Sequence, residues 1–260
     1  MDPRLRLVHD GAVAIVTLAD PATLNSLGPD LCASLIGLFE GLAASGEVRA
    51  AVLTGEGRAF SSGGNLLDIA KAADGGGDVQ DYVERLYNPL AETLRGLPFP
   101  LVTAINGVAA GIGCAYALAG DLVIAAESAS FNVAFRRIGL VPDGGSTWLL
   151  PRLIGHARAM EMVMLGETIP APRALEWGMI NRCVPDAELP AAALALARRL
   201  AEGPAALVLA RRLMWKSSEA DWSEQLAAEA VAQGAASRTE DFREGVASFL
   251  EKRSPRFNGR

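Results

Sequence analysis

The sequence predicts an α/β fold with right-handed crossovers, followed by a layer of helices. Up to about residue 190, short apolar runs that end in glycine alternate with segments of helical spacing. From about Pro190 onward, nearly every segment is rich in Ala and Leu at helical spacing. Half of the 260 residues are hydrophobic, enough for one well-buried domain with a helical appendage. We therefore expect a core over residues 1–190 and a C-terminal layer over residues 191–260, of a kind that often packs on a neighbouring subunit.

The core elements follow from local patterns. LRLVHDGAVAIVTLA alternates apolar residues around Asp10-Gly11, which predicts a hairpin with a two-residue turn. A helix is expected between Gly28 and Gly46, and a short strand in VRAAVLTG. PLVTAINGV and DLVIAAE are typical of buried strands and flank the glycine-rich helix GIGCAYALAG. The glycines at 75–77 predict a mobile loop.

Charge and cysteine content exclude several classes. There are 24 basic and 30 acidic residues, a net charge of −6, without the basic stripe that nucleic-acid binding needs. Cys32, Cys114 and Cys183 are widely spaced and form no CxxC pair, so neither a zinc site nor a disulfide framework is expected. The N-terminal segment MDPRLRLVHDG has no apolar run typical of a signal peptide. A cytoplasmic location is expected.

One uncharged segment is long enough to span a bilayer. It runs for 25 residues from Gly96 to Gly120. It contains Asn106, two prolines and five glycines, which favour a buried strand, a glycine loop and a buried helix. No membrane partner is therefore expected.

The common cofactor and nucleophile motifs are absent from the sequence. His9 and His156 are the only histidines, and there is no G-x-S-x-G elbow or metal-ligand cluster. GIGCAY lacks the third small residue of a dinucleotide fingerprint, and no phosphate-binding P-loop occurs. We expect no cofactor and no metal.

Two glycine-rich turns follow predicted strands. They are GRAFSSGGNLLDI, from Gly57, and INGVAAGIGCAYAL, from Ile105. Each places backbone N–H groups at a tight turn or helix start, where negative charge is favoured. Either one alone fits an ordinary structural turn. Two of them in one α/β chain with an acid nearby indicate an oxyanion hole made from main chain.

Several segments, in order, resemble the crotonase family, also called the enoyl-CoA hydratase/isomerase superfamily: AFSSGGNL, INGVAAGIGC, FNVAFRRIGLVPDGGSTWLLPRLIG, ALEWGMINRCV and the ending DFREGVASFLEKRSPRF. The resemblance covers about residue 4 to the C-terminus. It implies a crotonase fold, with repeated ββα units forming a spiral core and a C-terminal helical trimerisation layer. It also implies a homo-trimer or a hexamer (dimer of trimers), and acyl-CoA thioester substrates in which coenzyme A is part of the substrate.

The resemblance also assigns roles to particular residues. By position, the N–H groups of Gly64 and Ile112 hold the enolate oxygen. Hydratases of the family use two glutamates, and the matching positions here are Ala115 and Phe135. Neither can move a proton, so efficient hydration is not expected.

Asp143, in the turn PDGG, has two possible roles. As a helix N-cap it would accept the free N–H of Gly145 or Ser146. Some family members, however, carry their acid at this position. A single carboxylate suits isomerisation, in which one proton leaves one carbon and returns to another. Apolar neighbours such as Phe135 and Leu140 are expected to raise its pKa.

Coenzyme A contacts are expected from the resemblance at Leu24, Ser26, Leu66, Asp68 and, from a neighbouring subunit, at Lys252 and Phe257. Each also fits an ordinary apolar, solvated or anchoring position. Asn65 replaces an aspartate common in the family beside the adenine pocket. Arg136 and Arg137 fit either a phosphate contact or a solvated helix face. Tyr87 and Trp148 fit either an aromatic substrate pocket or core packing.

Three functions remain open. LYNPL, EWGMI and VPDGGSTWLLPRLIGHARAM are most similar to the family's phenylacetate-pathway isomerases, which act on ring-epoxidised phenylacetyl-CoA and also shift double bonds in enoyl-CoA. The first hypothesis is therefore an isomerase with Asp143 as the proton shuttle. The second is a hydratase of the same family. The third is a non-catalytic acyl-CoA-binding subunit.

Overall fold

The strands lie in two sheets. The computed structural model describes residues 2–74 and 78–260, so the loop expected at 75–77 lies outside the described residues. The larger sheet has the order β1-β2-β3-β5-β7-β10, in which β1 is antiparallel to β2 and the other neighbours are parallel. Its strands are β1 (Leu5–Asp10), β2 (Val13–Leu18), β3 (Ala50–Gly55), β5 (Leu101–Ile105), β7 (Leu122–Ala126) and β10 (Arg182–Val184).

The smaller sheet gives the core its repeat. It has the order β4-β6-β8-β9, with strands β4 (Ala59–Ser61), β6 (Val108–Ala110), β8 (Ser130–Asn132) and β9 (Ile169–Pro170). Three times, a strand of the large sheet is followed by one of the small sheet and then by a helix: β3-β4-α2, β5-β6-α5 and β7-β8-α6. These ββα units confirm the predicted crotonase fold.

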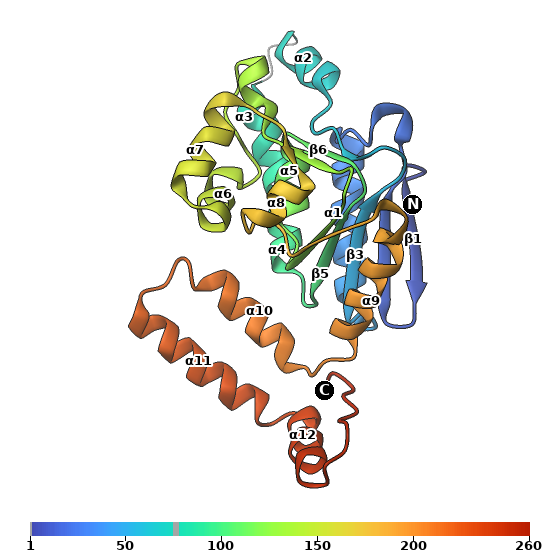
Figure 1. The fold of residues 1–260 in the computed structure, drawn as a ribbon, viewed down its shortest axis with the longest axis vertical. Helices are drawn as coiled ribbons and strands as arrows, with labels where there is room; N and C mark the ends of the chain where they lie inside the picture. The colour runs from blue at the N-terminus through green and yellow to red at the C-terminus, as the bar shows by residue number, and fades with distance from the viewer. Residues whose placement is uncertain (1, 75–77) are drawn as a thin grey trace.

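Helices surround the two sheets and then leave them (Figure 1). The α-helices are α1 (Pro29–Ser45), α2 (Leu66–Asp74), α3 (Val79–Tyr82), α4 (Asn88–Gly96), α5 (Ile112–Leu118), α6 (Ser146–Ile154), α7 (His156–Leu165), α8 (Ala171–Glu176), α9 (Leu189–Ala201), α10 (Ala206–Lys216), α11 (Trp222–Ala236) and α12 (Glu240–Leu250). Short turns are η1 (Pro21–Thr23), η3 (Ala134–Ile138), η4 (Asp186–Glu188) and the π-helical turn η2 (Val83–Tyr87).

The N-terminal hairpin is present with its turn one residue later than predicted. Asp10 pairs with Val13, so the two turn residues are Gly11 and Ala12. Gly11 has a φ of +55°. Glycine adopts this left-handed conformation without a steric penalty, so the turn is placed on Gly11 as its first residue.

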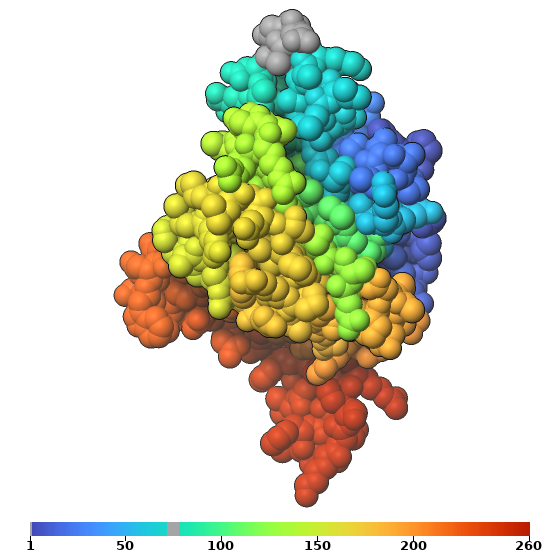
Figure 2. Space-filling model, turned by 45° about the horizontal axis from the view of Figure 1, so that its top comes forward, coloured from blue at the N-terminus to red at the C-terminus, as the bar shows by residue number. Residues whose placement is uncertain are grey.

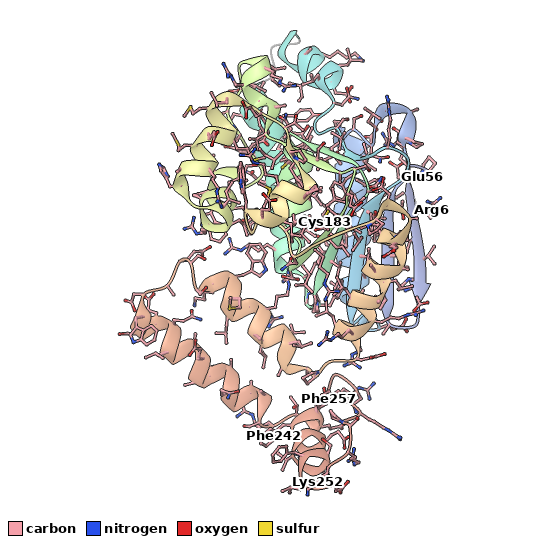
Figure 3. The ribbon with its side chains drawn as sticks, in the orientation of Figure 1. Arg6, Glu56, Cys183, Phe242, Lys252 and Phe257 are labelled. Atoms are coloured by element: carbon pink, nitrogen blue, oxygen red, sulfur yellow. The ribbon has the colours of Figure 1, made fainter. Side chains whose placement is uncertain are left out.

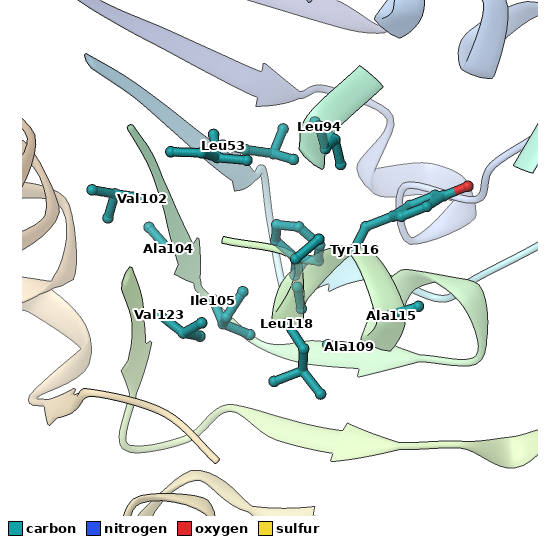
Figure 4. Packing of buried hydrophobic residues seen from close by; sticks show 14 of the residues in the cluster. Leu53, Leu94, Val102, Ala104, Ile105, Ala109, Ala115, Tyr116, Leu118 and Val123 are labelled. Atoms are coloured by element: carbon teal, nitrogen blue, oxygen red, sulfur yellow. The ribbon is translucent and has the colours of Figure 1, made fainter. Parts of the chain in front are cut away.

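The uncharged segment from Gly96 to Gly120 forms β5, β6 and α5, as predicted. Every residue of β5 and α5 is buried, and side chains such as Ile105 and Leu118 pack in one apolar cluster (Figure 4). Parallel strands covered on both faces have this continuous apolar composition. In the described ranges 2–74 and 78–260, no helix is long and apolar enough to cross a membrane.

The C-terminal helices divide into two groups. Helix α9 packs on β2, β3, β5 and β7, so it covers the large sheet. Helices α10 to α12 project from the body (Figure 2). The part of the chain that leaves the core therefore begins after α9, later than the boundary at residue 191 expected from composition.

One buried ion pair attaches the projecting helices to the core. Arg211 on α10 is 7% exposed, and its Nε donates to Asp121 Oδ2 at 2.7 Å. The same guanidinium donates to the carbonyls of Leu94, Arg95 and Leu97 at the end of α4. Trp215 Nε1 donates to the other Asp121 oxygen at 2.8 Å. Because each carboxylate oxygen has a donor, the pair is compensated for its burial.

Candidate active site

A pocket of about 520 Å³ opens between the two glycine turns and the segment that follows β8. Most of its wall is apolar or uncharged, and Arg137 and Asp143 are the charged side chains among the described lining residues. The lining consists of Thr23, Ser26, Ser62, Gly64, Asn65, Leu66, Leu67, Ile69, Val79, Tyr82, Val83, Tyr87, Gly111, Ile112, Ala134, Phe135, Arg137, Ile138, Leu140 and Asp143.

Hydrogen bonds to Leu27 hold the first glycine turn on both sides of Gly64 and leave the N–H of Gly64 free. Leu27 N donates to Gly63 O at 2.8 Å, and Asn65 N donates to Leu27 O at 3.3 Å. Gly64 lies between these two bonds and lines the pocket, and its own N–H donates to no acceptor among the described residues. Ser61 Oγ accepts from Gly63 N and donates to Asn25 O, so it ties the turn to the segment at Asn25.

The second glycine turn contacts the first. A Cβ at Gly63, whose φ is +94°, would lie 2.6 Å from Ala110 O, so only glycine permits this approach. Gly111 N donates to Asn132 O at 2.8 Å, and α5 begins at the next residue, Ile112. As the first residue of a helix, Ile112 has a free N–H on the positive end of the helix dipole. Both predicted donors thus lie on the pocket wall, in two turns packed against each other.

The side chain of Asp143 is not a helix cap. Helix α6 begins at Ser146 with Gly145 as its N-cap, and no side chain bonds to the cap. Ser146 N donates instead to the backbone carbonyl of Asp143 at 3.0 Å. The N-cap interpretation is therefore wrong, because two glycines with φ of +57° and +83° turn the chain before the helix starts.

The environment of Asp143 favours its neutral form. Oδ1 is buried and has no hydrogen-bond partner among the described residues. Burial raises the pKa of the carboxyl group from 3.8 to about 6, as the apolar neighbours Phe135 and Leu140 predict. A carboxyl group with a pKa near neutrality can both accept and return a proton.

The two positions at which the resemblance places hydratase glutamates carry no acid here and lie in different surroundings. A Cβ at Gly144 would lie 2.1 Å from Ile112 Cδ1 and 3.0 Å from Ala115 Cβ, so the Asp143 turn lies directly on Ala115. Ala115 is 1% exposed and does not line the pocket. Phe135 does line it and contributes an apolar wall.

Only some of the expected coenzyme A contacts lie at the pocket within one chain. Ser26 and Leu66 line it. Leu24 is not a lining residue; its carbonyl accepts from Ser62 N, and Ser62 lines the pocket. Asp68 is not a lining residue either, and its Oδ2 lies 3.0 Å from a Cβ built on Gly28. Asn65 lines the pocket while its Oδ1 accepts from Leu67 N at the start of α2.

Lys252 and Phe257 lie in the projecting C-terminal part, remote from the pocket of their own chain (Figure 3). Phe257 packs near Gly245 on α12, and Lys252 is exposed. Their expected role, in the pocket of a neighbouring subunit, stays a prediction.

The remaining candidates separate clearly. Arg136 and Arg137 donate to the carbonyls of Leu165 and Gly166, so both bond to the end of α7. Of the two aromatic candidates, Tyr87 lines the pocket. Trp148 does not line it and follows the packing alternative: its indole stacks on Trp215 with 6.2 Å between ring centroids, beside a separate cavity of about 310 Å³.

Three lining residues of the pocket were not expected from the sequence. Ile69, Val79 and Tyr82 come from α2 and α3. Tyr82 packs edge-on against Tyr87 with 5.4 Å between ring centroids. Neither helix carries a motif, and the helical spacing of apolar residues in VQDYVERLY is the signal that could have predicted a face packed on the core.

The fold and this pocket define a class: repeated ββα units, two glycine turns with free N–H groups at the pocket wall and, among the described lining residues, one carboxyl group. The chain belongs to the enoyl-CoA hydratase/isomerase family, whose sequence profile matches residues 9–260. It is 44% identical over 252 residues to the 1,2-epoxyphenylacetyl-CoA isomerase of Escherichia coli K12, covering 95% of each chain. It is 43% identical over 249 residues to a "Probable enoyl-CoA hydratase" of Rhodobacter capsulatus, again covering 95% of each.

Solved structures give the same assignment. An enoyl-CoA hydratase from Polaromonas sp. JS666 matches 98% of this chain and 99% of its own, with a TM-score of 0.93 and 33% identity. The resemblance inferred from the sequence motifs is confirmed. Relatives named as isomerase and as hydratase stand at nearly equal identity, so the reaction has to be argued from the site.

Proposed function

We propose that the protein is an acyl-CoA isomerase that acts on an unsaturated or ring-epoxidised acyl group, with Asp143 as the proton shuttle. The observation that carries this proposal is that Asp143 is the only carboxyl group among the described lining residues, and its pKa is raised to about 6. The N–H groups of Gly64 and Ile112 hold the thioester oxygen.

In double-bond migration, the Asp143 carboxylate removes a proton from C2 of a 3-enoyl thioester. The C2–H bond breaks, and its electron pair is shared between the thioester oxygen, C2 and C4, which gives a dienolate. Gly64 and Ile112 stabilise this charge by donating hydrogen bonds to the oxygen. The protonated Asp143 then returns the proton to C4, so the double bond lies between C2 and C3 and no atom is gained or lost.

Hydration is the alternative reaction, supported by the 43% identical relative. Addition of water needs one group to activate the water and a proton source for C2. With Ala115 covered by the Asp143 turn and Phe135 apolar, the described pocket offers Asp143 alone for both tasks. We therefore favour isomerisation.

The assembly that we propose is a homo-trimer, or a hexamer built as a dimer of trimers. Its support is the large apolar side chains exposed on the projecting helices: Met214, Trp222, Val231, Phe249 and Leu250 are 72–83% exposed in the single chain. Large apolar side chains exposed to this degree on three successive helices favour burial against another subunit. Lys252 and Phe257 would then lie near a neighbour's pocket.

The test compares two substrates with purified protein. A 3-enoyl-CoA is followed for the gain of conjugated absorbance by isomerisation, and a trans-2-enoyl-CoA for its loss by hydration. We expect isomerisation to fall at least about 100-fold in Asp143→Asn, since general acid–base catalysis contributes that much. Brisk hydration that survives the substitution would refute the proposal. Failure of bound acyl-CoA to exchange α-hydrogens with solvent would instead indicate the non-catalytic binding subunit.

A further inference from the structure

Tyr87 is bonded to both arms of the proposed oxyanion hole. It lies at the end of the π-helical turn η2, is 2% exposed, and lines the pocket. Insertions of this kind in helices are frequent at functional sites, because the extra residue redirects a side chain. The edge-on contact with Tyr82 fixes the orientation of its ring.

The Tyr87 side chain supports the Gly64 arm. Its Oη donates to Leu27 O at 3.2 Å, the same carbonyl that accepts from Asn65 N. Leu27 N holds Gly63 O at 2.8 Å. Thus one residue, Leu27, fixes the chain on both sides of Gly64, and Tyr87 holds Leu27.

Tyr87 also contacts Gly64 directly. A Cβ built on Gly64 would lie 2.5 Å from Tyr87 Oη, while the next nearest side chain, Ile69, is 3.2 Å away. The hydroxyl therefore occupies the space that a side chain at Gly64 would need. Burial raises the pKa of Tyr87, so the hydroxyl remains protonated and remains a donor across neutral pH.

The Tyr87 backbone is held by the other arm. Tyr116 Oη donates to Tyr87 O at 2.9 Å, and Tyr116 is 3% exposed. Figure 4 shows Tyr116 extending from α5 with its hydroxyl at the end of the ring. Tyr116 lies four residues after Ile112 in the same short helix, α5, whose first residue supplies the second donor.

We propose that Tyr87 is a positioning residue that sets the separation of the Gly64 and Ile112 N–H groups. The proposal rests on the proposed function, because it requires a thioester oxygen between these two donors. Tyr87 does not take part in proton transfer. Its hydroxyl holds Leu27, which is hydrogen-bonded to the residues on both sides of Gly64, and its carbonyl is held by Tyr116 on helix α5. The two donors therefore keep a fixed separation when charge develops on the oxygen.

The experiment measures the carbonyl stretching frequency of a saturated acyl-CoA, labelled with ¹³C at the thioester carbon, bound to the protein. Two hydrogen bonds to the oxygen lower this frequency relative to free ligand. In Tyr87→Phe, which keeps the ring, we expect the frequency to move back towards that of the free ligand. The kcat for isomerisation should fall about tenfold while KM changes less than about twofold, since a misplaced oxyanion donor acts on the transition state.

Two further variants keep the test decisive. Tyr116→Phe removes the other bond and should shift both readouts in the same direction, so it replaces Tyr87→Phe if that variant does not fold. Thr54→Val is the matched control, because Thr54 Oγ1 donates to Ala104 O at 2.7 Å between β3 and β5, outside the pocket. It removes one bond of the same type and should leave frequency and kcat unchanged.

A double substitution tests the contact itself. Gly64→Ala places its Cβ against Tyr87 Oη, so we expect a larger loss of kcat in the parent than in the Tyr87→Phe background. Such non-additivity is expected of residues in contact.

The outcomes separate the two proposals. No frequency shift on binding to the parent protein would refute the oxyanion hole and with it the proposed function. A shift in the parent that persists in Tyr87→Phe and Tyr116→Phe, with kcat unchanged, would overturn the role of Tyr87 alone.

Discussion

Asp143→Asn should inactivate the protein and stabilise it at the same time. In the folded chain, burial raises the pKa of Asp143 from 3.8 to about 6. Between these pH values the folded state binds more protons than the unfolded state, so stability falls as pH rises through this window. Above about pH 6, Asp143 is ionised in the folded state, and the free energy of unfolding is lowered by the full cost of burying its charge. At about 1.4 kcal/mol for each pKa unit, this cost is about 3 kcal/mol.

The pH dependence gives the sharpest form of this prediction. Asn cannot ionise, so the variant lacks the penalty at every pH. The difference in unfolding free energy between variant and parent should grow by about 2 kcal/mol between about pH 4.5 and about pH 8. Any loss of packing in the variant is independent of pH and cancels from this change.

The assay is denaturant unfolding at matched protein concentration, repeated across the pH range. Asp186→Asn serves as the control, because the hydroxyl and the N–H of Ser128 lower the pKa of Asp186 below 3.8. A lowered pKa changes stability only in the pH window below 3.8, so the difference between this variant and the parent should stay nearly constant between about pH 4.5 and about pH 8. A difference between Asp143→Asn and the parent that stays constant with pH would show that Asp143 is not held in an unfavourable environment.

Three further predictions concern the turn and the buried pair. Gly144→Ala should lower kcat at least about tenfold in a steady-state isomerisation assay, because its Cβ would lie 2.1 Å from Ile112 Cδ1 at a φ of +57°; unchanged kcat would show that the turn can relax. Ala115→Glu should gain no hydration activity and unfold at lower denaturant concentration, since the Asp143 turn covers that position; measurable hydration would refute this. Asp121→Ala should lower the free energy of unfolding by about 3–5 kcal/mol, because it leaves the Arg211 guanidinium buried without a counter-charge; a loss below about 1 kcal/mol would contradict it.

The large sheet could be predicted and the small sheet could not. Strands β5 (LVTAI) and β7 (LVIAA) have five residues each, all apolar except Thr103, and a proline or a polar residue bounds each end, a pattern that local sequence reveals. Strands β4, β6 and β8 have three residues each, too few for any periodicity to appear. Their pairing comes from the way each ββα unit stacks on the one before, which only the folded chain contains.

The candidate site was predictable where it depends on main chain. The two glycine turns can be predicted from the residue type, since glycine adopts conformations that other residues avoid, whereas the family resemblance assigned Gly64 and Ile112 as the individual donors. The role of Asp143 stays open in the sequence, because its side chain can cap the helix only if the helix begins directly after it. Helix boundaries are the least reliable part of a prediction from sequence. The two alternatives for Trp148 stay open in the sequence because its stacking partner, Trp215, lies on a helix far along the chain.

The junction between Asp121, Arg211 and Trp215 has a consequence for the order in which the chain acquires structure during synthesis. Each bond made by Arg211 joins residues at least 90 positions apart, and all of its acceptors precede it in the chain. These acceptors, at the end of α4 and just before β7, are therefore synthesised long before the arginine that binds them. We expect the ribosome-bound core to fold first, with its two glycine turns already in contact, and the projecting helices to dock last. A nascent chain halted before Arg211 would then hold a formed pocket without the projecting helices that carry the proposed trimer interface.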